Sequence, residues 1–205
     1  MKQTYFVTGI GTEVGKTVAS AILTEALEAD YWKPIQAGDL DNSDSHKVER
    51  LISNDKTVFH KNSFALKTPM SPHAAAEIDE VKITSKKIKR PKTENSLIIE
   101  GAGGLLVPIS DKETIADLIQ PEDRIILVSR HYLGSINHTL LTIEALNSRG
   151  LNCFGIIFSG EENKSTESII KKMSGVTVLG RIEQEPYFDQ NVIKECAELF
   201  REKLK

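Results

Sequence analysis

The most informative stretch of the sequence is Gly9-Ile-Gly-Thr-Glu-Val-Gly-Lys-Thr17. It directly follows a short apolar run over residues 5–8 and opens a helical pattern over residues 16–29. This is the setting that a phosphate-binding loop requires. Glycines allow backbone N–H groups to turn toward phosphate oxygens, and the N-terminus of the helix adds partial positive charge. The stretch therefore predicts a nucleotide site.

Two side chains of this loop have predicted roles at the phosphates. Lys16 would place its ammonium group on the β- and γ-phosphates, and the hydroxyl of Thr17 would bind Mg²⁺. The loop departs from the pattern GxxxxGK[ST], because Ile10 stands at the first required position, between Gly9 and Gly11. The strand–helix setting and the upstream glycines still favour nucleotide binding.

Outward from the loop, short apolar runs alternate with helical patterns. The expected strands cover residues 5–8, 31–35, 97–100, 125–129, 154–158 and 177–182. The expected helices include residues 16–29, 43–53, 136–148, 165–173 and 191–204. Most strand runs are continuously apolar, which is typical of parallel strands that are buried on both faces. The pattern predicts an α/β fold, a doubly wound and mostly parallel sheet in a single domain over residues 1–205, with ligands at the carboxyl ends of the strands.

Composition argues against several classes of protein. Of the 205 residues, 40% are hydrophobic and 27% are charged, which is ordinary for a soluble globular protein. The formal net charge of −3 disfavours a protein that coats nucleic acid. No apolar run approaches the roughly 18 residues of a membrane span, and the N-terminal apolar stretch is too short for a signal peptide. Cys153 and Cys196 are isolated, which suits a reducing compartment, so we expect a cytoplasmic protein.

Candidate metal carboxylates follow the predicted strands. Glu100 closes an apolar run and precedes Gly101-Ala-Gly-Gly104, so it resembles the end of a Walker-B strand followed by a flexible glycine turn. Asp44, in Asp41-Asn-Ser-Asp44, is ambiguous, and local sequence alone favours a helix N-cap. Lys33 lies in a strand-like run and is either a strand-end lysine that reaches solvent or a functional cation.

The sequence leaves open the roles of some polar residues elsewhere. Asn137 and His138 follow residues 134–136 at a predicted helix start, where free N–H groups would hold a carboxylate. His138 reads as an ordinary helix residue rather than a catalytic base, and His73 is undecided.

The motifs resemble, in order, those of the dethiobiotin synthetases. The matching segments are Thr8–Thr17, Lys33-Pro-Ile-Gln-Ala-Gly38, Ser71-Pro-His73, Glu100-Gly-Ala-Gly-Gly104 and Leu133-Gly-Ser-Ile-Asn-His138. The resemblance is good over residues 5–151 and thinner beyond. It implies a P-loop NTPase fold, a homodimer with the active site across its interface, and ring closure on 7,8-diaminononanoate with CO₂, ATP and Mg²⁺ in biotin biosynthesis.

The resemblance also implies roles for single residues. Lys16 and Lys33 would be the catalytic cations around the transferred phosphoryl group, since positioned cations offset the charge on its oxygens. Residues at the nucleotide and Mg²⁺ would be Glu13, Val14, Gly15, Lys16, Thr17, Val18, Asp44, Glu100, Gly101, Ala102 and Gly103, with Thr17, Asp44 and Glu100 on the metal. Residues at the diamine would be Thr12, Ala37, Gly134, Ser135, Ile136 and Asn137, the last four from the neighbouring subunit.

Three positions depart from the family pattern. Ala37 stands where the family usually has Ser or Thr, so one hydrogen bond to the substrate is missing or replaced. Ser159-Gly160 stands where the family reads adenine with an Asn-Asp pair, and Glu183 stands where it has proline. The changes at residues 159, 160 and 183 predict relaxed selection among nucleotide bases.

Two other classes of function stay open from the residues. One is a P-loop switch or partitioning ATPase, in which nucleotide controls dimerisation and partner binding. Such proteins commonly carry a second lysine five residues before the invariant one, and Gly11 stands at that position. The other is a nucleotide-binding regulator without catalysis, which only the changes at Ala37, Ser159 and Gly160 favour.

Overall fold

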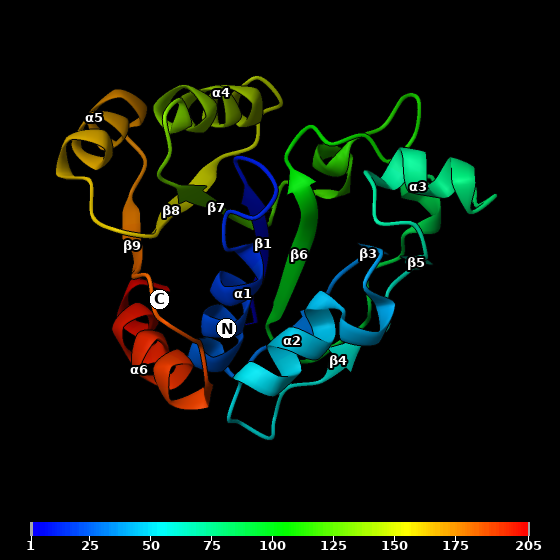
Figure 1. Ribbon diagram of the computed structural model, residues 1–205, viewed down its shortest axis with the longest axis horizontal. Helices are drawn as coiled ribbons and strands as arrows, with labels where there is room; N and C mark the ends of the chain where they lie inside the picture. The colour runs from blue at the N-terminus through cyan, green and yellow to red at the C-terminus, as the bar shows by residue number, and fades with distance from the viewer. Residues whose placement is uncertain (1, 205) are drawn as a thin grey trace.

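The computed structural model describes residues 2–204 and is built around a seven-stranded sheet (Figure 1). The strand order is β4-β2-β6-β1-β7-β8-β9, and every neighbouring pair is parallel. The strands are β1 (Thr4–Gly9), β2 (Asp30–Trp32), β4 (Phe59–His60), β6 (Leu97–Gly104), β7 (Arg124–Arg130), β8 (Cys153–Ser159) and β9 (Val178–Ile182). The predicted α/β class and parallel sheet are confirmed.

Helices cover both faces of this sheet. The helices are α1 (Lys16–Leu27), α2 (Asp44–Leu51), α3 (Pro72–Ile78), α4 (Ser135–Asn147), α5 (Lys164–Ser174) and α6 (Gln190–Arg201). Four short 3₁₀ helices accompany them, namely η1 (Leu40–Asn42), η2 (Ser85–Lys87), η3 (Ile115–Leu118) and η4 (Glu202–Leu204). Helices α1, α2 and α6 lie on one side of the sheet, whereas α4 and α5 lie on the other (Figure 1).

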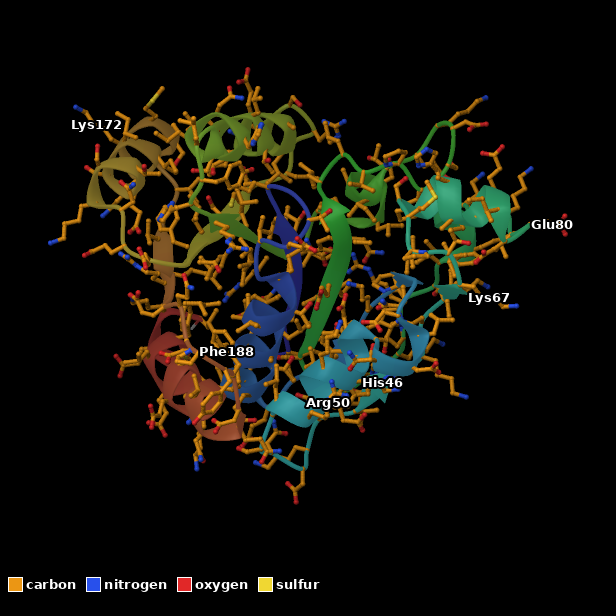
Figure 2. The ribbon with its side chains drawn as sticks, in the orientation of Figure 1. His46, Arg50, Lys67, Glu80, Lys172 and Phe188 are labelled. Atoms are coloured by element: carbon orange, nitrogen blue, oxygen red, sulfur yellow. The ribbon has the colours of Figure 1, made fainter. Side chains whose placement is uncertain are left out.

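Alternate side chains along β1 pack on opposite faces of the sheet. Within β1, Tyr5 and Val7 pack into the cluster under α1 and α6, whereas Phe6 packs into the opposite cluster with η3. All three side chains are buried, so both faces of the central strand are apolar. Phe188, in the segment before α6, packs against the first of these clusters (Figure 2).

The run expected as one strand over residues 31–35 is broken. β2 ends at Trp32 and β3 (Ile35–Ala37) begins after Pro34, pairing with β5 (Phe64–Leu66) in a separate two-stranded sheet. Proline has no N–H to donate to a ladder, and it restricts the residue before it, so the strand is interrupted there. Strands β4 and β5 and helix α3 are too short to carry a periodic signal and were not predicted.

The expected glycine turn after Glu100 is wrong. Residues 101–104 continue β6, and Gly104 lies opposite Gly9 across the ladder with β1. A Cβ atom on Gly101 would lie 3.2 Å from Ile115 and 3.3 Å from Phe6, so glycine allows close packing here rather than a turn. No helix among residues 2–204 has the length and apolarity needed to cross a bilayer.

Candidate active site

The phosphate-binding loop lies between β1 and α1 at the carboxyl end of the central strands. Gly15 directly precedes α1 with φ 95°, in the left-handed region that glycine adopts without strain. A Cβ atom at Gly15 would come within 2.8 Å of the hydroxyl of Ser159, so glycine is also required by space. The amide of Ile10 donates to the carbonyl of Val128 at 3.1 Å, which fixes the start of the loop on β7.

Lys16 folds back over this loop. Its Nζ donates a hydrogen bond to the carbonyl of Gly11 at 2.8 Å, and only 7% of the residue is exposed. Burial lowers the pKa of Lys16 to about 8, although the negative charge of Glu100 acts in the opposite direction. The ammonium group is therefore held inside the loop in an environment that lacks enough negative charge to balance it, which suits it to an anionic ligand.

Glu100 accepts hydrogen bonds from three side chains. Thr17 Oγ1, in the first turn of α1, donates to Oε1 at 3.0 Å, and Tyr31 in β2 donates its hydroxyl proton to Oε2 at 2.8 Å. Lys33 Nζ donates to Oε1 at 3.1 Å. Glu100 is 1% exposed, so its charge is satisfied by protein groups rather than by water.

Lys33 is buried between two carboxylates, and the interpretation as a solvent-reaching lysine is wrong. Its Nζ pairs with Asp44 Oδ2 and with Glu100 Oε1, and the residue is 4% exposed. Burial alone would lower the pKa of Lys33, but the charges of Glu100 and then Asp44 outweigh it and raise the pKa above 10.5. The break at Pro34 leaves Lys33 outside both strands.

The capping interpretation of Asp44 is also wrong. Ser43 is the N-cap of α2, and its hydroxyl accepts from the amide of His46, which Figure 2 labels on this helix. The carboxylate of Asp44 instead pairs with Lys33, and Lys47 lies 3.6 Å away on the same helix. Burial tends to raise the pKa of Asp44, but the charge of Lys33 outweighs it and lowers that pKa.

Three oxygen-bearing groups converge here, from Thr17, Asp44 and Glu100. They are linked through Lys33 and through the bond between Thr17 and Glu100. No cluster of three or more His, Cys, Asp or Glu in the described part of the chain is placed to hold a metal. Two carboxylates and a hydroxyl suit Mg²⁺, which takes few protein ligands and completes its shell with phosphate oxygens and water.

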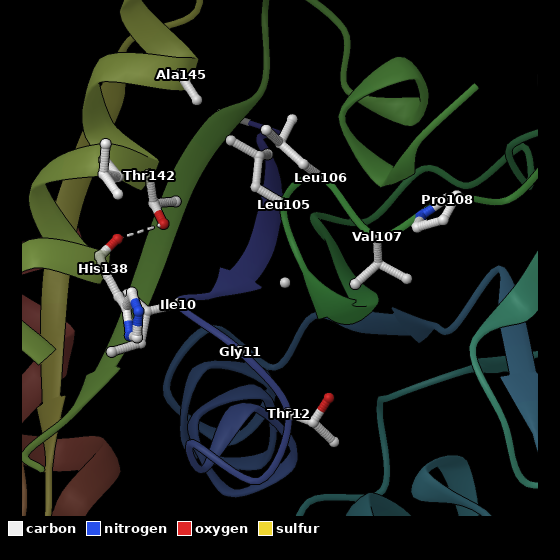
Figure 3. A pocket seen from close by; sticks show the side chains of 12 residues that line it. Ile10, Gly11, Thr12, Leu105, Leu106, Val107, Pro108, His138, Thr142 and Ala145 are labelled. Carbon is white, nitrogen blue, oxygen red and sulfur yellow. Dashed lines mark hydrogen bonds between the residues drawn. The ribbon is translucent and has the colours of Figure 1, made fainter. Parts of the chain in front are cut away.

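A largely apolar cavity of about 410 Å³ lies beside the loop (Figure 3). It is lined by Ile10, Gly11 and Thr12 from the loop, by residues 104–108 at the end of β6 and beyond it, and by His138, Leu141, Thr142 and Ala145 from α4. Of the residues expected at the diamine, Thr12 alone lines it. Ala37, at the end of β3, and residues 134–137, at the start of α4, lie outside this lining.

The start of α4 presents apolar side chains to solvent. Gly134 precedes the helix with φ 105°, and Ser135 is buried. Leu133, Leu141 and Leu106 are exposed apolar residues on and near α4, and Ile136 is 36% exposed. An exposed apolar surface of this kind is typical of a contact with another protein.

The position of the expected base readers is at the end of β8. Gly160 has φ 96°, and its amide donates to the carbonyl of Ile182 at 2.9 Å, so it is not available to a ligand. Glu183 pairs with Arg181 across 3.4 Å. A cavity of about 250 Å³ adjoins this point, and sequence reasoning missed most of the residues that line it, which are Arg130, His131, Ser159, Gly160, Glu161, Glu162, Asn163 and Gln184.

Tyr31 is a further residue that sequence reasoning missed. It is a buried aromatic residue two positions before Lys33, and by itself it looks like an ordinary core residue. Only the position of its hydroxyl against Glu100 distinguishes it, and that depends on how β2 pairs with β6.

Comparisons with known proteins give relatives that match over nearly the whole chain. The family model described as AAA domain matches residues 3–192. The chain is 69% identical over 204 residues to an ATP-dependent dethiobiotin synthetase BioD from Christiangramia forsetii, covering 100% of this chain and 99% of that protein. It is 48% identical over 195 residues to the ATP-dependent dethiobiotin synthetase BioD of Cytophaga hutchinsonii, covering 94% of each.

Solved structures show the same fold at low sequence identity. The cell division ATPase MinD of Pyrococcus furiosus superposes with a TM-score of 0.60 at 13% identity, covering 100% of both chains. A ParA family ATPase from Chlorobium tepidum gives a TM-score of 0.59 at 13% identity, covering 100% of this chain and 94% of that one. These likenesses concern the fold alone. Since the high identities to the synthetases extend over nearly the whole chain, the chain belongs to the family of ATP-dependent dethiobiotin synthetases, the ligases of biotin biosynthesis.

Proposed function

We propose that the protein, acting as a single-domain subunit of a cytoplasmic homodimer, uses CO₂, ATP and Mg²⁺ to close the ureido ring of dethiobiotin on 7,8-diaminononanoate. The observation that carries this proposal is the burial of Lys33 between Asp44 and Glu100, next to the phosphate-binding loop. A loop that only bound nucleotide would not need a second buried cation there. Phosphoryl transfer to a carbamate does need one, since negative charge accumulates on the phosphoryl oxygens.

The reaction has three steps. One amine of the substrate adds to CO₂ and loses a proton, which gives a carbamate. A carbamate oxygen then attacks the γ-phosphorus of ATP, and ADP leaves with the electrons of the broken bond. The second amine attacks the carbonyl carbon of the resulting carbamic–phosphoric anhydride and loses a proton, and phosphate leaves with the electrons of the broken carbon–oxygen bond as the ring closes.

The chain's own residues hold the phosphates and the metal. Lys16 and Lys33 would lie on either side of the transferred phosphoryl group. Thr17, Asp44 and Glu100 would hold Mg²⁺, which neutralises charge on the phosphate oxygens. The rest of the nucleotide would contact Glu13, Val14, Gly15, Val18, Gly101, Ala102 and Gly103.

The cavity beside the loop fits the aliphatic part of the diamine. Its lining is largely apolar, and Thr12 lies on its loop side (Figure 3), where it would contact the amines. The carboxylate at the far end of the substrate would bind at residues 134–137 of a second copy of the chain. The exposed Leu133 and Ile136 beside that helix start support a contact between subunits. Ala37 would lie near the substrate without a hydroxyl to offer it.

The deciding experiment measures ADP release with each substrate omitted in turn. We expect release to require both 7,8-diaminononanoate and bicarbonate, with dethiobiotin detected by mass spectrometry in equal amount. ATP hydrolysis that ignores both compounds would instead indicate a switch or partitioning ATPase. Sedimentation of the wild type and of Leu133→Glu tests the homodimer, because a charge within an apolar interface should give a monomer.

A further inference from the structure

The hydroxyl of Tyr31 lies deep in the molecule, against the carboxylate of Glu100. Tyr31 is fully buried, and its hydroxyl donates to Glu100 Oε2 at 2.8 Å. Its ring packs against Phe59 with the ring centroids 5.7 Å apart. Packing therefore fixes the ring, and the ring fixes the direction in which the hydroxyl points.

Sheet register explains why these two residues meet. β2 and β6 are parallel, with Tyr31 beside Ile98, and Glu100 follows two residues later on the same face of β6. Val7 of β1 lies opposite Glu100 and packs in the same cluster as Tyr31 and Ile98. This is the face that α1 covers, so Tyr31 and Thr17 approach the carboxylate from different elements.

The donors to Glu100 divide between its two oxygens. Oε2 accepts from Tyr31, whereas Oε1 accepts from Thr17 and Lys33. A carboxylate that is bound on one oxygen cannot rotate freely about its terminal bond, so the other oxygen keeps its direction. We infer that Tyr31 is a positioning residue for the Mg²⁺ site, because its hydroxyl holds Glu100 with Oε1 turned toward Thr17. The inference rests on the proposed function, in which Thr17 and Glu100 hold the metal.

Tyr31 would act on the metal through Glu100, since its hydroxyl donates to that carboxylate. Residues that orient a metal-binding carboxylate through a hydrogen bond typically contribute 10–100-fold to metal affinity. Removing the hydroxyl alone should therefore weaken Mg²⁺ binding and leave the nucleotide contacts unchanged.

The test compares Tyr31→Phe with the wild type by isothermal titration calorimetry. A non-hydrolysable ATP analogue is titrated once with EDTA and once with saturating Mg²⁺, and the ratio of the two dissociation constants gives the gain due to the metal. We expect Tyr31→Phe to lower this gain about tenfold or more, with the EDTA value within about twofold of wild type. Tyr5→Phe is the matched control, since Tyr5 is a buried tyrosine whose hydroxyl donates to the carbonyl of Leu204.

Glu100→Gln separates this inference from the proposed function. If Tyr31 acts through Glu100, then adding Tyr31→Phe to Glu100→Gln should change the Mg²⁺-dependent gain by less than about twofold. If Tyr31→Phe keeps the normal Mg²⁺-dependent gain in nucleotide affinity and Glu100→Gln loses it, then the role of Tyr31 is overturned and the proposed metal site stands. A normal gain in Glu100→Gln would overturn the proposed metal site, and the role of Tyr31 with it. If Tyr31→Phe loses nucleotide affinity equally with and without Mg²⁺, or does not fold, then Tyr31 serves the core, and the inference is also overturned.

Discussion

The hydroxyl of Thr17 donates a hydrogen bond to Oε1 of Glu100 at 3.0 Å, although the two residues are 83 positions apart. The contact exists because β1 and β6 are neighbours, with Val7 directly opposite Glu100. Thr17 stands in the first turn of the helix that follows β1. The loop and the carboxylate are therefore placed together by the central pair of strands. A substitution at Thr17 or Glu100 should therefore alter the position of the other side chain.

Replacing Lys33 by alanine should reduce both stability and turnover. Without this ammonium group, the buried carboxylate of Glu100 and the half-buried carboxylate of Asp44 lose their cation, which typically costs about 3 kcal/mol or more of unfolding free energy. Turnover should fall by roughly 10²–10³, since a positioned charge is lost from the transition state. Urea unfolding in EDTA and steady-state kinetics measure the two effects.

A matched control for Lys33 is available on the same acidic group. Lys47 also approaches Asp44, but its side chain is 36% exposed, so Lys47→Ala should cost less than about 1 kcal/mol. Near-normal turnover in Lys33→Ala would remove Lys33 from the reaction.

Replacing Lys16 by alanine should instead reduce turnover without a loss of stability. Burial lowers the pKa of Lys16 to about 8, so the folded protein holds its charge less readily than the unfolded chain does. Loss of the ammonium group should lower kcat/KM roughly 10²–10³-fold, while the urea midpoint does not fall below that of the wild type. A clear loss of stability at normal turnover would show that Lys16 serves the fold rather than the phosphates.

Asp44→Asn should weaken the binding of Mg²⁺ without unfolding α2. Ser43 supplies the cap of this helix, so the substitution removes only a charge. Mg²⁺ prefers carboxylate oxygens, and the Mg²⁺ concentration for half-maximal rate should rise about tenfold or more. Ser43→Ala is the control, since it should cost about 1 kcal/mol of stability and leave the Mg²⁺ dependence unchanged. A loss of stability in Asp44→Asn with no change in the Mg²⁺ concentration for half-maximal rate would make Asp44 a structural residue.

The sequence predicted those parts of the fold that depend on neighbouring residues. The loop, α1 and the long apolar strands are local patterns, and they were found. What failed depended on distant contacts: whether Lys33 reaches solvent follows from the break at Pro34, and Asp44 meets Lys33 only because α2 returns to the sheet. The contact between Tyr31 and Glu100 follows from strand register, which no stretch of either strand reveals by itself.

Stability should fall in acid through Asp30, which lies away from the site. Burial tends to raise the pKa of this carboxyl, but hydrogen bonds, first of all from Thr93 at 2.6 Å, outweigh burial and lower it below 3.8. Since the folded pKa is lower than the unfolded one, the contribution is complete above pH 3.8 and is lost as the pH falls through the folded pKa.

Asp30→Asn tests this contribution. At pH 7 the variant should be less stable by about 2 kcal/mol. The reason is that the NH₂ group of asparagine cannot accept the hydrogen bonds that one carboxylate oxygen of Asp30 accepts. Denaturant unfolding at several pH values should show that the difference in unfolding free energy between the two proteins becomes smaller below pH 3.8. A difference that is constant with pH would mean that the charge of Asp30 contributes nothing.

Selection of the nucleotide base should be weak. Ser159 offers one hydroxyl, which lies against Gly15, and the amide of Gly160 is already bonded to Ile182. A hydroxyl cannot span the donor and acceptor of the adenine edge as a side-chain amide does, and a site without such a reader discriminates poorly. Lys16, Thr17 and Mg²⁺ would hold any triphosphate equally. We therefore expect kcat/KM for GTP, CTP and UTP within about tenfold of ATP, a difference of about 1.4 kcal/mol, measured at saturating diamine and bicarbonate. An ATP preference of about a thousandfold would mean instead that the cavity beside Gln184 reads adenine.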